Sequence, residues 1–266
     1  MKFDLFLSDF DGTLGGNPDY IDLDTVKAIK EYEERGGIFT IVTGRSFASI
    51  RGICRKYGLK GKVVSFQGST IADIESGDYI QKEGVPLETA LEIIREIKKD
   101  GLDFVVWIDD VLYYSNLSKY VSLFVADNGV LCERVDDLEK KVLELGVKVN
   151  KVCAFSLDKD PIKDVTRYTG KFKEVSVNSG AEHLIEFINS KYHKGFAVKY
   201  LAKTYGVPYN RIIAVGDSTN DIGLVDGEWY GVAVGDASPV LKEKAKEITL
   251  PFSEHPIKHL LNKYCK

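Results

Sequence analysis

Two aspartates separated by one residue, Asp9 and Asp11, follow a short apolar segment near the start of the chain. If residues 2–9 form a buried strand, both carboxylates can point the same way, because side chains on a strand repeat every two residues. The carboxyl end of a parallel strand is also where open α/β sheets bind their ligands. One carboxylate could then attack an electrophile while the other moves protons, as in enzymes that form and hydrolyse an aspartyl-phosphate. Such a pair also occurs in ordinary polar turns, so by itself it does not predict a function.

Three later segments place related chemistry at the ends of other predicted elements. Thr43-Gly44-Arg45 lies between an apolar strand and a helix, where hydroxyl and backbone N–H groups can bind phosphate. Lys194 opens another predicted helix and could neutralise a phosphoryl group. Residues 216–221, Gly-Asp-Ser-Thr-Asn-Asp, follow an apolar strand, and their carboxylates are the hard oxygen ligands that Mg²⁺ prefers. Each segment alone has an ordinary structural explanation, but their order and their positions together indicate a phosphoryl-transfer site.

The elements that must position these residues alternate between strand and helix at both ends of the chain. Apolar runs predict strands at 2–9, 38–42, 62–66, 211–215 and 230–234, and helices are predicted at 22–34, 46–57, 193–205, 220–225 and 239–246. Such alternation implies a parallel sheet with right-handed crossovers. We therefore predict an α/β fold whose core is a Rossmann-like, doubly wound parallel sheet.

The middle of the chain has a different pattern. Strands are predicted at 103–108, 111–115, 147–157, 172–177 and 183–188, and helices at 86–99, 136–145 and 161–169. Consecutive strands without intervening helices favour an α+β unit with an antiparallel sheet. We therefore expect a discontinuous core, residues 1–81 and 189–266, interrupted by an α+β domain at 82–188.

Composition narrows the partners and the compartment. The 266 residues carry 36 Lys and Arg against 40 Asp and Glu, a formal net charge of −4, whereas nucleic-acid-binding domains present a basic face. No apolar run approaches the ~20 residues of a membrane span, and the first residues do not resemble a signal peptide. The four cysteines are far apart and form no CxxC pair, which favours free thiols over a zinc site or disulfides. We expect a cytoplasmic protein without nucleic-acid or membrane partners, and the sequence leaves its oligomeric state open.

The motifs together resemble those of the haloacid dehalogenase (HAD) superfamily: Asp9-Phe10-Asp11-Gly12-Thr13-Leu14, then Thr43-Gly44-Arg45, Lys194-Gly195 and the segment 216–221. The long insert between the second and third motifs resembles the Cof-like branch, in which this insert is a cap domain. The resemblance covers nearly the whole chain. It implies a Mg²⁺-dependent phosphatase or phosphotransferase that works through an aspartyl-phosphate.

The resemblance also implies roles for individual residues. Asp9 would be the nucleophile and Asp11 the general acid–base. Thr43, Gly44 and Lys194 would bind the phosphoryl oxygens. The metal ligands would be the carboxylates of Asp9 and Asp217 with the backbone carbonyl of Asp11, while Asn220 and Asp221 would support Lys194 or the metal shell.

Three positions depart from the usual pattern of this branch. Gln67-Gly68-Ser69 stands where Asn-Gly-Ala is common, Gly15-Gly16 follows the first motif in place of larger residues, and Asp236 replaces a frequent Asn. These departures concern the fit of substrate around the phosphate rather than the core chemistry.

Selection of the leaving group is expected to lie in the insert, because a cap that closes over the core would contact it and exclude water. The candidates there are Trp107, Asp109, Tyr113, His183 and Glu186. The alternative for Trp107 and Tyr113 is a place in the core of the insert, and for His183 a place on a strand surface. Basic residues do not cluster in the insert, which disfavours a highly anionic leaving group.

Three functions are compatible with the motifs. The leading hypothesis is a phosphatase acting on small phosphorylated metabolites, such as sugar phosphates or related monoesters. A phosphomutase resembling phosphomannomutase is the alternative. A non-catalytic phospho-acceptor switch resembling a receiver domain is disfavoured, because such domains have ordinary single-domain length and lack the insert.

Overall fold

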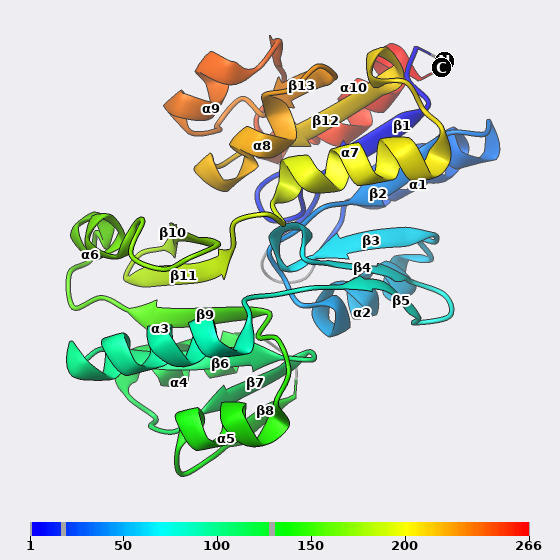
Figure 1. Ribbon diagram of the computed structural model, residues 1–266. Coiled ribbons are helices and arrows are strands. Elements are labelled where there is room, and N and C mark those ends of the chain that lie inside the picture. Colours follow the sequence, from blue (N-terminus) through cyan, green and yellow to red (C-terminus); the bar gives the residue numbers. More distant parts are fainter. Residues whose placement is uncertain (1, 17–19, 128–130, 266) are drawn as a thin grey trace. The chain divides into compact units, whose positions relative to one another are not determined.

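The computed structural model describes residues 2–16, 20–127 and 131–265. The chain divides into two compact units, Met1–Gln81 with His193–Lys266 and Lys82–Tyr192, which we call the first and second unit. Figure 1 shows that the chain leaves the first unit after strand β5 (Tyr79–Lys82) and returns to it at helix α7 (Lys194–Tyr205), which begins with the third motif. Each unit has its own hydrophobic core.

The first unit is built on a parallel sheet. Its strand order is β14-β13-β12-β1-β2, and the strands are β1 (Leu5–Ser8), β2 (Ile38–Ile41), β12 (Ile212–Gly216), β13 (Tyr230–Ala233) and β14 (Glu247–Ile248). A parallel bridge between Val42 and Val64 brings β3 (Lys62–Ser65) alongside β2. Strand β3 also pairs antiparallel with β4 (Thr70–Asp73), and β5 (Tyr79–Lys82) completes that three-stranded sheet.

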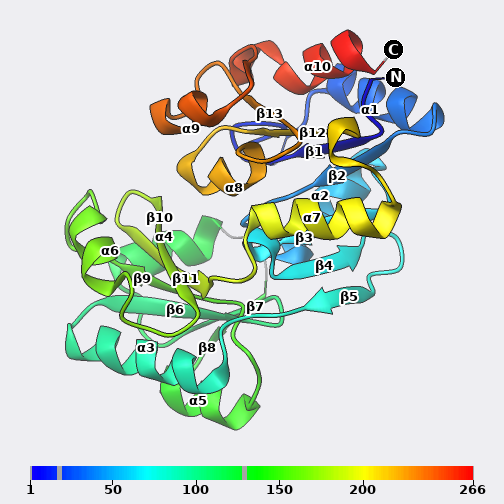
Figure 2. The same cartoon turned by 45° about the horizontal axis from the view of Figure 1, so that its top comes forward.

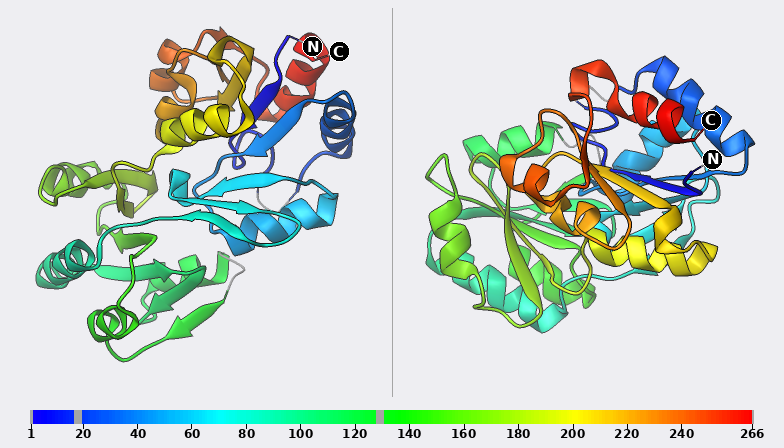
Figure 3. Two further views of the ribbon diagram at one scale, coloured as in Figure 1. Left: turned by 45° about the vertical axis from the view of Figure 1, so that its right-hand side comes forward. Right: turned by 90° about the horizontal axis from the view of Figure 1, so that it is seen from above.

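Helices cover both faces of the parallel sheet. Alternate residues of a strand point to opposite faces, and β1 has apolar, buried residues on both of them. Phe6 of β1 packs in the cluster beneath α1 (Leu23–Glu34), α2 (Phe47–Tyr57), α9 (Pro239–Lys244) and α10 (Pro256–Tyr264), whereas Leu5 and Leu7 pack beneath α7 and α8 (Ile222–Val225). Figure 2 shows α7 along one face of the sheet and α1 with α10 at the other. Within the first unit the two chain ends meet, because Lys2 N donates to Tyr264 O at 2.8 Å (Figure 3). The predicted doubly wound α/β core is confirmed.

The second unit has a six-stranded sheet of order β10-β11-β9-β6-β7-β8. Its strands are β6 (Asp103–Ile108), β7 (Val111–Tyr114), β8 (Cys132–Arg134), β9 (Lys151–Phe155), β10 (Val175–Ala181) and β11 (Leu184–Asn189). Neighbouring strands are antiparallel except β7 and β8, which pair in parallel. The predicted α+β character is thus confirmed, with one parallel pair in addition.

One face of this sheet packs under helices whose buried residues recur at helical spacing. These helices are α3 (Leu87–Lys99), α5 (Leu138–Leu145) and α6 (Ile162–Tyr168), while α4 (Lys119–Asp127) contacts β6. Asp109 and Asp110 join β6 to β7 with φ of 53° and 65°, the conformation of a two-residue hairpin turn. Within the described residues, no helix has the length and apolar character needed to cross a bilayer.

Candidate active site

The carboxyl ends of β1, β2 and β12 lie at one edge of the parallel sheet, and the motif residues follow directly. Asp9 N continues the ladder by donating to Val215 O at 2.9 Å, and Thr43 N donates to Val64 O at 2.9 Å. Gly12 has φ +74°, and a Cβ there would lie 2.8 Å from Asp217 Oδ2. The first motif can therefore approach the β12 loop this closely only with glycine at that position.

The ammonium group of Lys194 lies buried between two carboxylates. Its Nζ donates to Asp9 Oδ1 and to Asp221 Oδ1, each at 2.6 Å, and its side chain is only 1% exposed. Burial by itself lowers the pKa of a lysine, but the charges of Asp221 and Asp9 more than offset this and raise the pKa of Lys194. Lys194 is therefore a permanent positive charge in contact with Asp9.

Three carboxylates meet at this point. Side-chain oxygens of Asp9, Asp217 and Asp221 all lie within 4.8 Å of one another. Burial raises the pKa of Asp9, and repulsion by Asp221 raises it further against the opposing effect of Lys194. The pKa of Asp217 is raised by burial first and by the Asp221 charge second. One ammonium group thus faces three carboxylates, an excess of negative charge that suits a divalent cation with hard oxygen ligands.

Hydrogen bonds divide the three carboxylates into two kinds. Asp221 is fully buried and uses both oxygens internally, because Oδ1 binds Lys194 and Oδ2 accepts from the backbone N–H groups of Asp217 and Ser218, each at 3.1 Å. Asp217 Oδ1 accepts from the neutral hydroxyl of Thr13, at 3.0 Å. Both oxygens of Asp221 are therefore engaged within the chain, which leaves Asp9 and Asp217 better able to hold a cation.

Asp11 lies outside this cluster and is paired with Arg45. The guanidinium donates from Nε to Asp11 Oδ2 at 2.8 Å and from Nη2 to Oδ1 at 2.6 Å, and the side chain of Asp11 is 52% exposed. The guanidinium carbon of Arg45 also lies 4.8 Å from the centre of the Phe10 ring. The sequence analysis assigned no role to Arg45, although it stands in the second motif beside Thr43.

Thr43 and Gly44 lie against a turn that the sequence analysis noted only as a departure from the usual pattern. Thr43 is buried, and its Oγ1 accepts from Arg45 N at 3.2 Å, which leaves the hydroxyl hydrogen to donate. A Cβ on Gly44 would lie 2.6 Å from Gln67 Nε2, so the Gln67 amide occupies that place. Gln67 belongs to the short 3₁₀ turn η1 (Phe66–Gly68) at the carboxyl end of β3.

Asn220 and three candidates in the second unit contact residues of their own unit. Asn220 Oδ1 accepts from Ser218 Oγ at 2.8 Å. Trp107 is buried on β6 opposite Lys151, and Tyr113 is buried in the hydrophobic core under the helices. The His183 ring lies 4.5 Å from that of Tyr120, with Nδ1 3.0 Å from Ser156 O. The roles predicted for Trp107, Tyr113 and His183 stay predictions.

The two remaining candidates in the second unit form ion pairs. Asp109 Oδ1 lies 2.7 Å from Lys82 Nζ. Glu186 Oε1 accepts from Lys151 Nζ at 2.5 Å, and both side chains are buried. These pairs are contained within the second unit, and they leave the predicted contact with a leaving group as a prediction.

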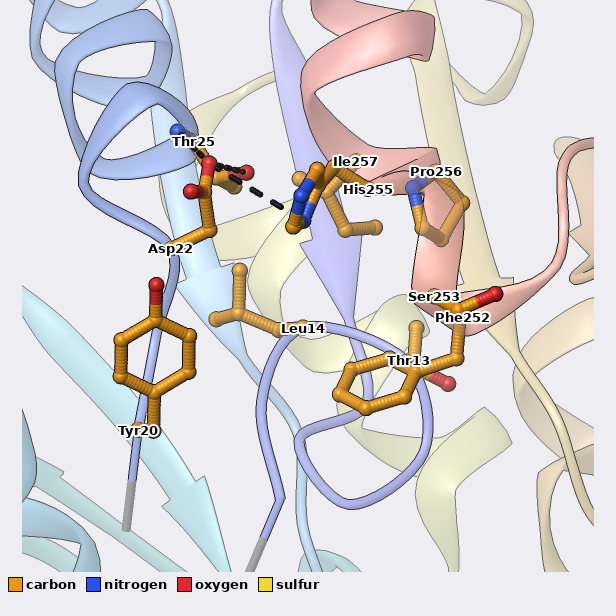
Figure 4. Close-up of a pocket in the computed structure, with 10 residues that line it drawn as sticks. All are labelled: Thr13, Leu14, Tyr20, Asp22, Thr25, Phe252, Ser253, His255, Pro256 and Ile257. Atoms are coloured by element: carbon orange, nitrogen blue, oxygen red, sulfur yellow. Dashed lines mark hydrogen bonds and ion pairs between the residues drawn. The ribbon is translucent and has the colours of Figure 1, made fainter.

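A small pocket of about 110 Å³ lies beside the loop of the first motif (Figure 4). Thr13 and Leu14 line it together with Tyr20, Asp22 and His255, and Asp22 Oδ2 caps α1 by accepting from Thr25 N at 2.8 Å. None of the carboxylates that surround Lys194 lines this pocket. It is therefore separate from the charged cluster, although Thr13 borders both.

Comparison with known proteins places the chain in a family. The family model of haloacid dehalogenase-like hydrolases matches residues 6–261. The phosphatase YwpJ of Bacillus subtilis is 25% identical over 97% of this chain and 98% of its own length. The 5-amino-6-(5-phospho-D-ribitylamino)uracil phosphatase YwtE of the same organism is 24% identical over 96% of this chain and 95% of its own length.

The fold agrees with that result. The solved structure of a haloacid dehalogenase-like hydrolase from B. subtilis superposes with a TM-score of 0.86 at 23% identity, covering 97% of this chain and 99% of the other. The chain therefore belongs to the haloacid dehalogenase-like hydrolase family.

Proposed function

We propose that the protein hydrolyses small phosphate monoesters in a Mg²⁺-dependent reaction through an aspartyl-phosphate on Asp9. The observation that carries this proposal is the buried contact of Lys194 with Asp9 and Asp221, with Asp217 beside them. A positive charge fixed at 2.6 Å from Asp9 Oδ1 can bind a phosphoryl oxygen and keep the carboxylate ionised when substrate arrives.

The proposed reaction has two steps, formation of the aspartyl-phosphate and its hydrolysis. A carboxylate oxygen of Asp9 attacks phosphorus and the ester P–O bond breaks. Asp11, separated from Arg45 and protonated when substrate is bound, gives its proton to the departing alcohol oxygen. Asp11 then takes a proton from water, whose oxygen attacks the phosphorus and releases inorganic phosphate and the Asp9 carboxylate. Thr43, the Gly44 N–H and Lys194 hold the phosphoryl oxygens during both steps.

The cluster has one ammonium group for three carboxylates, and this excess of negative charge favours the binding of a divalent cation. Asp9 and Asp217 would hold Mg²⁺ through their carboxylates and Asp11 through its backbone carbonyl, because both oxygens of Asp221 are already engaged. When bound, the cation offsets repulsion between the anionic nucleophile and the anionic phosphate and orients both.

The substrate class is proposed from relatives and from the insert. YwtE is named for 5-amino-6-(5-phospho-D-ribitylamino)uracil, a compound that carries its phosphate on a ribityl group. The predicted cap, residues 82–188, is proposed to select the leaving group, supported by its insertion between the second and third motifs. The four free thiols support the cytoplasm as the compartment.

A phosphate-release screen over metabolite monoesters with Mg²⁺ tests the function, with sugar phosphates as the favoured substrates. Asp9→Asn is expected to abolish release, because the amide supplies neither the anionic nucleophile nor the same metal ligand. Asp4→Asn is the matched control: Asp4 precedes the same strand, bonds Arg211 Nε at 2.7 Å and lies outside the cluster. Near-wild-type turnover by a folded Asp9→Asn protein, or no release from any monoester by the wild type, contradicts the proposal.

A further inference from the structure

Gln67 carries a buried polar atom without a partner in the described chain. Gln67 is buried, with only 5% of its surface exposed, and its Oε1 makes no hydrogen bond to any described residue. Its backbone is well held, since Gln67 N donates to Thr43 O at 2.9 Å. A buried amide oxygen normally finds a donor, so an orphaned one points to a partner outside the chain.

The neighbours of Gln67 place it at the proposed phosphoryl site. The Gln67 amide fills the position that a side chain on Gly44 would need, as described above. On its other side, a Cβ on Gly68 would lie 2.5 Å from His193 O, directly before Lys194. The turn therefore lies between the second motif and the start of α7, the two segments proposed to bind the phosphoryl group.

The backbone of the turn is strained. Phe66 and Gln67 have φ of 47° and 60°, left-handed conformations that cost free energy for residues with a side chain. The turn is held from outside by Gln81, whose Nε2 donates to Gly68 O at 3.3 Å and to Ser69 O at 3.4 Å. Strained residues of this kind gather at functional sites, where the surroundings enforce a geometry that the ligand requires.

We propose that Gln67 is a substrate-binding residue whose amide oxygen accepts a hydrogen bond from a hydroxyl group of the leaving group. This inference rests on the proposed function and specifies its substrate class as polyol or sugar phosphates. The chemistry of the two partners carries it. A phosphate dianion offers only acceptors, so an acceptor beside the phosphoryl site is satisfied by the organic part of the substrate, and a hydroxyl is the donor that a polyol supplies.

Two substrates with the same five-carbon chain isolate this hydrogen bond: ribitol 5-phosphate, which carries hydroxyls, and pentyl phosphate, which carries none. The variant is Gln67→Gly, because glycine adopts the observed φ without strain and is expected to keep or raise the thermal stability. Gln81→Ala, a change in the chain's other glutamine, controls for loosening of the same turn from outside. Gln67→Asn, which keeps an amide but withdraws it by one methylene, is the second variant if the glycine protein does not fold.

We expect Gln67→Gly to lose roughly tenfold or more of kcat/KM with ribitol 5-phosphate and less than about twofold with pentyl phosphate, as for a hydrogen bond that only one substrate makes. Gln67→Asn should show the same selective loss to a smaller degree, and Gln81→Ala should change the ratio of the two substrates little. Equal losses on both substrates, or no loss on either, would overturn the assignment of Gln67.

A binding measurement separates this inference from the proposed function. Calorimetry in an Asp9→Asn background, with and without Gln67→Gly, compares the affinities for both phosphates in the absence of turnover. A preference for ribitol 5-phosphate that disappears with Gln67→Gly supports the inference even if the wild type releases no phosphate. If the Asp9→Asn protein shows no such preference, or keeps it in the glycine variant, the inference is wrong whatever the catalytic result.

Discussion

Removing the charge of Asp217 should stabilise the metal-free protein and abolish its response to Mg²⁺. The Asp217 carboxylate lies within 4.8 Å of those of Asp9 and Asp221. Lys194 bonds the other two carboxylates, whereas Asp217 has no ion pair among the described residues. Asn in its place keeps an oxygen that can accept from Thr13 and removes the uncompensated charge.

The magnitude follows from the distances. Two unit charges 4.8 Å apart repel by about 3.5 kcal/mol at an effective dielectric constant of ~20. Attraction to Lys194 and partial solvent exposure of Asp217 reduce the net cost to about 1–2 kcal/mol. For a chain of this size, Asp217→Asn should then raise the metal-free Tm by roughly 3–6 °C.

Mg²⁺ should act in the opposite sense on the wild type. At a concentration ~100 times its Kd, a ligand that binds only the native state adds about 2.7 kcal/mol, which predicts a Tm rise of roughly 5–10 °C. Asp217→Asn should lose most of that rise. Asp226→Asn, which removes a carboxylate that lies 3.6 Å from Lys244 outside the cluster, is the matched control and should keep it.

The pH dependence gives the same prediction a second readout. The folded-state pKa values of Asp9 and Asp217 are raised above 3.8, so the native state holds more protons than the unfolded state in that range. Without metal, the stability contributed by the cluster therefore falls as pH rises through the raised pKa values. The stabilising effect of Asp217→Asn should be largest at neutral pH and should shrink towards pH 4.

Differential scanning calorimetry measures all three effects when it is run in EDTA, across a Mg²⁺ series, and in EDTA at several pH values between about 4 and 7. An Asp217→Asn protein with a lowered metal-free Tm and an undiminished Mg²⁺ response would refute both the charge argument and the metal site.

Four further predictions concern single groups and the competing activity. Lys194→Met leaves two carboxylates buried without their cation, so it should cost about 3–5 kcal/mol of stability, measured by denaturant unfolding, and abolish phosphate release. Asp11→Asn should lower kcat by ~10²–10⁴-fold, and single-turnover kinetics that show normal formation and hydrolysis of the aspartyl-phosphate would contradict its assigned role. Burial raises the pKa of Glu33 to about 7, so Glu33→Gln should raise Tm at pH 8 and change it little at pH 5, and the reverse dependence would be inconsistent with that shift. Phosphorus NMR of a mannose monophosphate incubation should show phosphate release outrunning isomerisation, whereas the opposite ratio would favour a mutase.

The strands of the parallel core could be predicted because their signal is local. Strands β1, β2 and β12 are short buried runs that end in polar residues, and parallel strands share one carboxyl edge. The meeting of Asp9, Asp217 and Lys194 follows from that topology. The helix expected at 220–225 is instead a 3₁₀ turn, η3 (Thr219–Asp221), followed by the short α8, because Asp221 turns inward to cap the loop and bind Lys194.

Other elements were not predicted, for different physical reasons. Helix α10 carries a clear signal, since Pro256 begins it and Ile257, Leu260 and Leu261 share its buried face. Strand β5 has no such signal, because most of its residues are exposed and it is specified by pairing rather than by burial. The Arg45–Asp11 pair is likewise a product of the assembled fold, since no spacing rule relates two loops that follow different strands.

The glycines of the site could be noticed in the sequence, but the reason for each of them is visible only in the folded structure. By sequence, the glycines of the first and second motifs indicate turns beside functional residues. The structure shows that the Cβ positions of Gly12, Gly44 and Gly68 are taken by Asp217, the Gln67 amide and His193 O. Each occupant comes from a segment other than the glycine's own motif, so these glycines set the distance between loops as well as the direction of the chain. A methyl group at Gly44 would push the Gln67 amide out of its position, which ties an apparently conformational residue to the group that we propose contacts the substrate.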